Sequence, residues 1–158
     1  MLIDEAIFRL LLRTIQKEGW LELPATGNSM FPYIQKGDKC RFVPCDPSAL
    51  NKGDVVLFLS SSNQLIAHRF VKRTESQHIH NKFVFKGDTN LGFDQPVENC
   101  RLIGKLTYVK KKHVTFTSDD VMARIWAYLI LAFPIISSFL RRYLNGKTNN
   151  NLKIDGVS

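Results

Sequence analysis

The sequence predicts a mainly β protein: one domain of antiparallel strands with an amphipathic helix at its N-terminal end and an apolar helix at its C-terminal end. Apolar residues recur at helical spacing in residues 1–19. From about Lys39 to Phe116 the chain consists of short runs rich in Val, Ile, Phe and Leu, separated by turn-forming residues. An apolar stretch of about 16 residues, from Ile125 to Leu140, follows. These three patterns together indicate the fold class.

The length and the composition of the chain are those of an ordinary globular domain. The 158 residues suffice for one core, and 44% hydrophobic with 23% charged residues excludes disordered and collagen-like classes. The net charge of +8 suits nucleic acid, an anionic membrane surface or an acidic peptide. The basic residues are scattered, however, and only Lys110, Lys111 and Lys112 form a run, so we do not expect nucleic acid as a partner.

The first element, residues 1–19, is predicted as an amphipathic helix that ends near Gly19. Charged residues such as Asp4, Arg9 and Lys17 interrupt its apolar residues, so it lacks the apolar core of a secretory signal and is expected to remain on the protein. Its apolar face requires a protein core or a membrane surface to cover it.

The second element, residues 20–117, is predicted as the β domain, with strands spaced as in a sandwich or barrel. The clearest strands are expected at 39–43, 55–59, 65–71, 83–85, 102–109 and 113–117. Lys-Gly-Asp occurs at 36–38, 52–54 and 86–88, and tight turns at strand ends explain all three copies.

The third element, residues 118–144, is predicted as one helix capped by Ser118-Asp119-Asp120. As a helix, Ile125 to Leu140 would be roughly 24 Å long, short for a hydrocarbon core of about 30 Å. Trp126 and the flanking arginines are typical of interfacial anchoring, and packing on the domain is the alternative. We expect a membrane-associated protein, spanning or surface-lying, with a cytoplasmic one as the alternative. The Asn-rich tail, 145–158, is predicted to be disordered.

The cysteines give little evidence of cross-links. Cys40, Cys45 and Cys100 are odd in number, and their spacing matches neither a disulfide framework nor a zinc site. They suggest a reducing compartment, and no metal or organic cofactor is expected.

One serine stands where a nucleophile could be exposed. Ser29 lies in the turn-like run Gly27 to Pro32, between an apolar approach and a proline. A serine hydroxyl needs a neighbouring base to become a nucleophile. His68 lies in a predicted strand that could hold an imidazole rigidly, whereas His78, His80 and His113 lie in or beside turns. From the pattern alone, a lone histidine in a strand such as His68 is more often structural than catalytic, and His78 with His80 could bind a metal.

Three boxes in order resemble a known family. Gly27-Asn28-Ser29-Met30-Phe31-Pro32 followed by Lys36-Gly37-Asp38 resembles the nucleophile box of signal peptidases and LexA-like peptidases. Gly53 to Val56 leading to Ala67-His68-Arg69, then Lys86 to Asn90 with Asp94 downstream, match the next two boxes. The resemblance covers roughly Pro24 to Gly104. Where bacterial signal peptidases and LexA carry a lysine, this chain has His-Arg, as in the endoplasmic-reticulum and archaeal type.

The resemblance implies an antiparallel β fold of the signal-peptidase and LexA type and a set of site residues. Ser29 would be the nucleophile, His68 its general base, and Asp94 the third member, with Asp88 as the competing candidate. Backbone N–H of Ser29 would stabilise the oxyanion, with Asn28 as a helper, and Met30 and Pro32 are expected at the substrate-binding site. Many signal peptidases have a serine two residues before the nucleophile, where this chain has Gly27.

The implied function is a serine endopeptidase that cleaves a leader or signal-like peptide through an acyl-enzyme, with small residues near the scissile bond. The run Leu23 to Pro32 is also similar to small peptidases encoded beside genes for ribosomally made peptides. One alternative is an inactive module of the same fold that binds a peptide or partner. Another is a LexA-like self-cleaving regulator, against which the roughly two dozen residues before Ser29 argue, because they are too few for LexA's DNA-binding domain.

Overall fold

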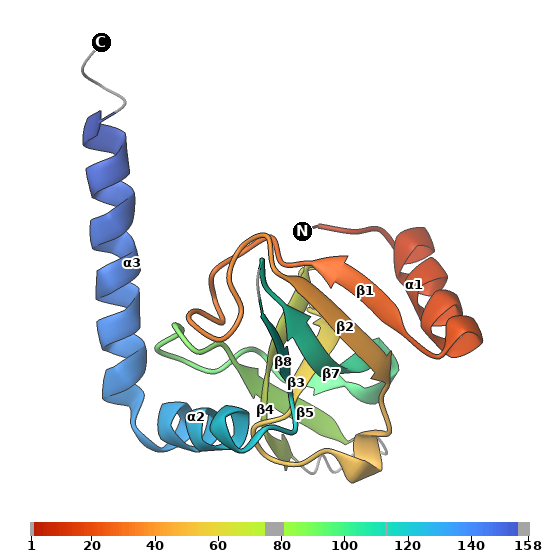
Figure 1. Cartoon of the computed structure of the whole chain (residues 1–158). Coiled ribbons are helices and arrows are strands. Elements are labelled where there is room, and N and C mark those ends of the chain that lie inside the picture. The colour runs from red at the N-terminus through yellow and green to blue at the C-terminus, as the bar shows by residue number, and fades with distance from the viewer. Residues whose placement is uncertain (1, 75–80, 113, 155–158) are drawn as a thin grey trace.

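A computed structural model describes residues 2–74, 81–112 and 114–154 of the chain. These residues form one curled antiparallel sheet with a helix at the N-terminal end and two helices at the C-terminal end (Figure 1). The strands are β1 (Leu21–Pro24), β2 (Lys39–Pro44), β3 (Val55–Leu59), β4 (Leu65–Thr74), β5 (Lys82–Lys86), β6 (Val97–Glu98), β7 (Leu102–Lys110) and β8 (Thr115–Thr117). The helices are α1 (Glu5–Glu18), α2 (Val121–Ala132) and α3 (Pro134–Ile154), with short 3-10 turns at Pro47–Ala49 and Asn99–Arg101.

The antiparallel sheet is as predicted, but the description of the chain as mainly β needs correction. Helices and strands occupy comparable lengths of the described chain, which is therefore mixed α and β. The difference arises at the C-terminal end, where α3 continues to Ile154 through most of the segment predicted to be disordered. After Pro134 no further proline interrupts this segment, so the helix continues. Residues 155–158 lie outside the described residues.

The strand order β1-β2-β7-β3-β4-β5-β6 places β7 between β2 and β3, and β7 also pairs with β8. Registers shift between Arg41 and Phe42 and between Leu57 and Phe58, as expected of β-bulges. A bulge bends its strand and increases its twist, which accounts for the curling of the sheet. The strands at the two ends of this order are β1 and β6.

Helix α1 covers one face of the sheet. Its N-cap Asp4 accepts a 2.8 Å hydrogen bond from the Ile7 N–H, and it ends at Gly19 with φ of 76°. Its apolar stripe buries Phe8 and Ile15 against the sheet. The helix lies so close to β7 that a Cβ on Gly104 would be 2.5 Å from the Ile15 Cδ1 atom.

A second apolar cluster forms the interior beside β4 and β5. It includes stacked Phe58 and Phe85 rings, 4.4 Å apart, with Phe70 and Phe83 against them. Because β3 is buried along its whole length, β4 has a rigid neighbour on that side.

The C-terminal segment forms two helices, not the single helix predicted for 118–144. Pro134 has no N–H to continue the α2 ladder, and it opens α3 instead. Figure 1 shows α3 running at a steep angle to α2. No single helix of the described residues has the length and apolar composition of a membrane span, although α2 and residues 134–147 have them jointly, with a bend of 98°.

Candidate active site

Ser29 lies in the connection between β1 and β2. The connection closes where Ala25 and the 37–38 turn exchange backbone hydrogen bonds, with the Ala25 N–H donating to the Asp38 carbonyl and the Gly37 N–H to the Ala25 carbonyl. Inside it, the Ile34 N–H donates to the Met30 carbonyl at 2.9 Å, and both side chains are buried in the core. These apolar anchors hold the turn while leaving the neighbouring Ser29 hydroxyl outside the core.

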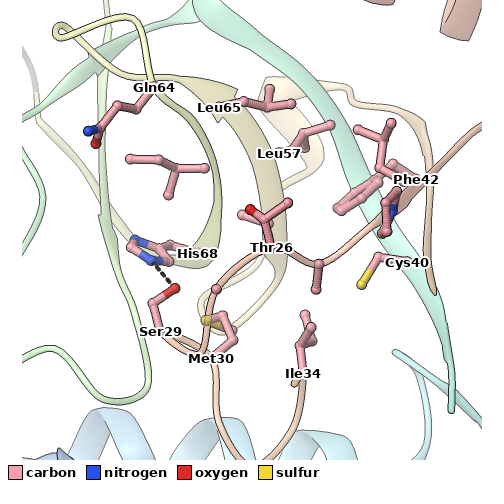
Figure 2. A pocket seen from close by; sticks show the side chains of 16 residues that line it. Thr26, Ser29, Met30, Ile34, Cys40, Phe42, Leu57, Gln64, Leu65 and His68 are labelled. Carbon is pink, nitrogen blue, oxygen red and sulfur yellow. Dashed lines mark hydrogen bonds between the residues drawn. The ribbon is translucent and has the colours of Figure 1, made fainter. Parts of the chain in front are cut away.

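His68 lies on β4 directly opposite Val56 of β3 and is only 4% exposed. Its Nε2 atom is 2.9 Å from the Ser29 Oγ atom (Figure 2). The two residues, 39 positions apart in sequence, therefore lie within hydrogen-bonding distance. A strand with buried neighbours holds the imidazole in place better than a loop would.

Asp94 completes a hydrogen-bonded chain. Its backbone N–H donates to the Phe85 carbonyl at 2.8 Å, and its Oδ2 atom lies 2.6 Å from the His68 Nδ1 atom. A carboxylate accepts but does not donate, so Nδ1 carries the proton in this contact and Nε2 is left to accept from the Ser29 hydroxyl. This is the arrangement of hydroxyl, imidazole and carboxylate that activates a serine nucleophile.

Asp88, the other aspartate considered as the partner of His68, does not contact it. It receives two hydrogen bonds from Arg69, from Nε at 2.7 Å and Nη2 at 3.0 Å, and both residues are buried. The Trp126 indole N–H also donates to Asp88, at 2.8 Å, and Arg69 donates to the Gly53 carbonyl at 3.1 Å. The Arg69 and Asp88 pair therefore joins β4 to the turn before β3 and to α2.

The sequence left Trp126 either as an interfacial anchor or as part of a helix packed on the domain, and the structure places its indole N–H against the domain. Its indole N–H points inward to a buried carboxylate, which is the kind of partner that a half-buried Trp requires. Helix α2 is thus fixed to the sheet, and Ala127 supports it by packing against Gly53. Sequence patterns did not reveal this role, because the contact joins residues 38 positions apart.

Gly87 lies closely against the Ser29 and His68 pair. A Cβ at this position would lie 2.9 Å from the His68 Nε2 atom and 2.9 Å from the Ser29 carbonyl oxygen. Gly37 and Gly53, in the other two Lys-Gly-Asp copies, have positive φ as a tight turn requires, but Gly87 does not. The predicted turn is present here too, because the Asn90 N–H donates to the Gly87 carbonyl at 3.1 Å directly after β5, but this glycine is needed for close approach and not for a positive φ. The next residue but one, Thr89, donates its N–H to the same Ser29 oxygen at 2.9 Å.

A mostly apolar pocket of about 380 Å³, here called the apolar groove, extends from the Ser29 and His68 pair (Figure 2). Met30, Ile34 and Leu57 supply apolar lining, as do Cys40 and Phe42. Burial raises the pKa of the Cys40 thiol to about 12, so this cysteine does not compete with Ser29 as a nucleophile.

The backbone on both sides of the apolar groove is available for pairing. Gln64, just before β4, and Phe70 within it direct their backbone groups toward β3, so by alternation Leu65 and Ala67 direct theirs away from it. Leu2 forms an isolated antiparallel bridge with Gln64, and β5 pairs with β4 only from Arg69 onward. Between these two pairings, the edge is open around Ala67 within the described residues. Ala25 bonds toward β2, so its neighbours Pro24 and Thr26 also face away from their partner strand.

The other predicted site residues take different positions. Met30, which the resemblance places at the substrate-binding site, lines the apolar groove, whereas the Pro32 carbonyl accepts from the Lys111 ammonium at 3.2 Å and lines neither pocket beside Ser29. The Asn28 side-chain oxygen accepts from the Lys36 N–H at 3.1 Å, which leaves its amide NH₂ as a donor. Within the described part of the chain the Ser29 N–H has no hydrogen-bond partner, so it is free to bind an oxyanion.

The three remaining histidines, His78, His80 and His113, lie outside the described residues, and with them the alternative metal pair. Among residues 2–74, 81–112 and 114–154 no group of three or more His, Cys, Asp or Glu side chains is placed to hold a metal ion. No protein-family model matches this chain, and no curated protein has significant sequence similarity to it. The function of the site is therefore inferred from its residues and their arrangement.

Proposed function

We propose that the protein is a serine endopeptidase whose nucleophile, base and orienting acid are Ser29, His68 and Asp94. The observation that carries this proposal is the continuous chain of hydrogen bonds, 2.9 Å and 2.6 Å long, at one end of an open apolar groove. In sequence, its three boxes resemble those of the signal-peptidase and LexA-like clan, and we propose that the curled sheet is a member of that fold.

The arrangement supports an acyl-transfer mechanism. As the Ser29 Oγ atom attacks the peptide carbonyl carbon, His68 Nε2 takes the hydroxyl proton, and Asp94 stabilises the imidazolium. His68 then gives this proton to the leaving amine, so the C–N bond breaks and an acyl-enzyme remains. Water, deprotonated by the same imidazole, resolves the ester. The free Ser29 N–H is the proposed oxyanion donor, and a single such donor is typically worth about 10² to 10³ in kcat.

The apolar groove favours an extended peptide as substrate. A peptide lying between the β4 edge around Ala67 and the Pro24–Thr26 edge would gain backbone hydrogen bonds as an added strand. Met30, Ile34 and Phe42 would pack against the side chains that point into the groove. We propose that small residues of a leader or signal-like peptide occupy this groove just before the scissile bond.

We also propose that α2 and α3 contact an anionic lipid surface. Exposed apolar side chains recur at helical spacing, with Val121, Ile125 and Tyr128 on α2 and Ile135 and Phe139 on α3. The sequences of the two helices contain five basic residues and no acidic one. Apolar stripes beside basic residues are the composition of interfacial helices, and an anionic lipid complements both.

Cleavage of defined peptides tests the peptidase proposal. The purified protein is incubated with leader-like peptides that carry Ala at the two or three positions before a chosen bond, and the products are identified by mass spectrometry. Wild type is expected to give two fragments from one bond, and Ser29→Ala none. Fragments produced equally by Ser29→Ala would contradict the proposal. Tight binding of the peptide by wild type without cleavage would instead support an inactive binding module.

A further inference from the structure

A second pocket, here called the α3 pocket, adjoins the site and does not coincide with the apolar groove. Its volume is about 590 Å³, and it is formed by Asn28, Ser29, residues 89–94 and one face of α3. Ser29 lines both pockets, so a peptide whose carbonyl carbon lies at Ser29 Oγ can extend into each of them. The apolar groove accounts for one direction of the peptide only.

Helix α3 is held against this side of the site by two contacts. The Lys86 ammonium donates to the Ser137 hydroxyl at 2.7 Å, and Ser137 is fully buried. The Tyr143 ring stacks on Phe31, two residues after the nucleophile, with ring centroids 5.8 Å apart. The pocket wall that α3 supplies is therefore fixed relative to Ser29.

Helical spacing then determines which side chains of α3 face the pocket. Arg141 and Asn145 follow the buried Ser137 at intervals of four residues, so the three lie on one face of the helix, and the last two line the pocket. Arg142 is one position farther along, roughly 100° around the helix, and does not line it. Both arginines are exposed.

The charge of the pocket favours an anionic group. Arg141 makes no ion pair or hydrogen bond with any described residue. The one carboxylate in the lining, Asp94, accepts from His68 through its Oδ2 atom. Asn90 and Thr89 contribute neutral polar groups, and the half-exposed Leu91 and Phe93 add apolar surface beside them. A guanidinium without an internal partner is a bidentate donor available to a carboxylate.

We propose that the α3 pocket receives the residues that follow the scissile bond, and that Arg141 selects substrates with an acidic side chain among the first three of them. The inference rests on the proposed peptidase function and adds a specificity to it. Arg141 acts on binding and position and not on proton transfer, because it has no contact with Ser29 Oγ, His68 or Asp94.

The measured quantity is a ratio of kcat/KM values for two matched substrates. Both are C-terminally amidated peptides that differ only in Glu or Lys at the second position after the bond. Because both peptides are amidated, a free C-terminal carboxylate is excluded as the ligand of Arg141. A third peptide, with Lys at the second position after the bond and a free C-terminal carboxylate, tests that ligand separately. Wild type is expected to prefer Glu by about fivefold or more, as a partly exposed ion pair allows. Because the ratio cancels any loss of folded enzyme, it reports on specificity alone.

Two charge reversals distinguish a specific role from the general field of a basic protein. Arg141→Glu should bring the Glu-to-Lys ratio below one, whereas Arg142→Glu, the adjacent exposed arginine, should keep the wild-type ratio. Equal ratios in the two variants would overturn the proposal. The proposal would also be overturned if Arg141→Glu changed kcat/KM for peptides with Glu before the scissile bond and not for peptides with Glu after it. The α3 pocket would then hold the residues that precede the bond.

Binding separates this inference from the proposed function itself. Fluorescence anisotropy with Ser29→Ala measures the affinity for the same labelled peptides without any hydrolysis. A preference for Glu that is lost on adding Arg141→Glu supports the α3 pocket even if wild type cleaves nothing. Cleavage by wild type with no preference for Glu in either assay would leave the peptidase standing and refute the role of Arg141.

Discussion

His68 and Arg69 are consecutive residues of β4, and they bind two different aspartates of the segment that follows β5. Successive side chains of a strand point to opposite faces, so the two residues separate into different environments. His68 meets Asp94 at 2.6 Å beside the open groove, and Arg69 meets Asp88 at 2.7 Å in the interior. One dipeptide thus serves both the candidate active site and the packing that supports it.

Replacing Asp94 with Asn should abolish most of the activity while leaving the fold intact. The Asn NH₂ can donate to Nδ1, which puts the His68 proton on Nε2, where it cannot accept from Ser29. We expect kcat for peptide cleavage to fall by about 10³ to 10⁴, with the midpoint of thermal unfolding little changed. Activity within a few-fold of wild type would show that Asp94 does not orient His68.

The substitution Asp88→Asn should have the opposite balance of effects. It removes the charge that compensates the buried Arg69 guanidinium, and breaking a buried ion pair typically costs about 3–5 kcal/mol. We expect the free energy of unfolding, from urea titration followed by circular dichroism, to fall by about that amount. An unchanged stability together with lost activity would instead make Asp88 a residue of the catalytic machinery.

Gly87→Ala tests the close packing behind the nucleophile. The new Cβ would be placed 2.9 Å from both His68 Nε2 and the Ser29 carbonyl oxygen, so one of these groups must move. A displacement of about 1 Å between reacting groups can cost about 10² in rate, and we expect at least that loss in kcat/KM. Gly146→Ala is the control, because its Cβ would meet nothing within 4 Å. Equal activity of the two variants would refute the proposed contact.

The lipid proposal predicts that flotation with vesicles depends on α3. With vesicles containing an anionic phospholipid, Ile135→Ser combined with Phe139→Ser should lower the bound fraction, because burying each side chain is worth about 2 kcal/mol. We expect at least a tenfold weaker partition coefficient. Leu10→Ser, at an exposed position on α1, is the control and should float like wild type. Parallel losses in all variants, or none, would count against contact through these helices.

Much of the local structure could be predicted from the sequence. The strand at 55–59 has the predicted bounds, and those at 39–44, 65–74 and 102–110 differ only at their ends, because continuous runs of apolar residues mark buried strands. The strands at Leu21–Pro24 and Val97–Glu98 were missed, since they are short and contain Glu or Pro. Local patterns also could not show that Pro134 starts a second helix instead of sitting within one.

The candidate site likewise contains residues that the sequence predicted and features that only the structure shows. Ser29, His68 and Asp94 were selected from a resemblance in sequence, and the structure brings their side chains into one hydrogen-bonded chain. The role of Trp126 and the α3 pocket depend on contacts between residues far apart in sequence, for which local periodicity carries no signal. Likewise, the Lys-Gly-Asp motif of Gly87 indicates only a turn, and the close approach of this glycine to His68 is visible only in the structure.

Labelling with a serine-reactive fluorophosphonate, followed by intact-mass spectrometry, shows whether His68 activates Ser29. We expect one adduct per chain in wild type, located on Ser29, no adduct in Ser29→Ala, and labelling at least 10² slower in His68→Ala, since the hydroxyl then lacks its base. Equal labelling of the three proteins would show that Ser29 is not activated by His68 and would refute the proposed peptidase.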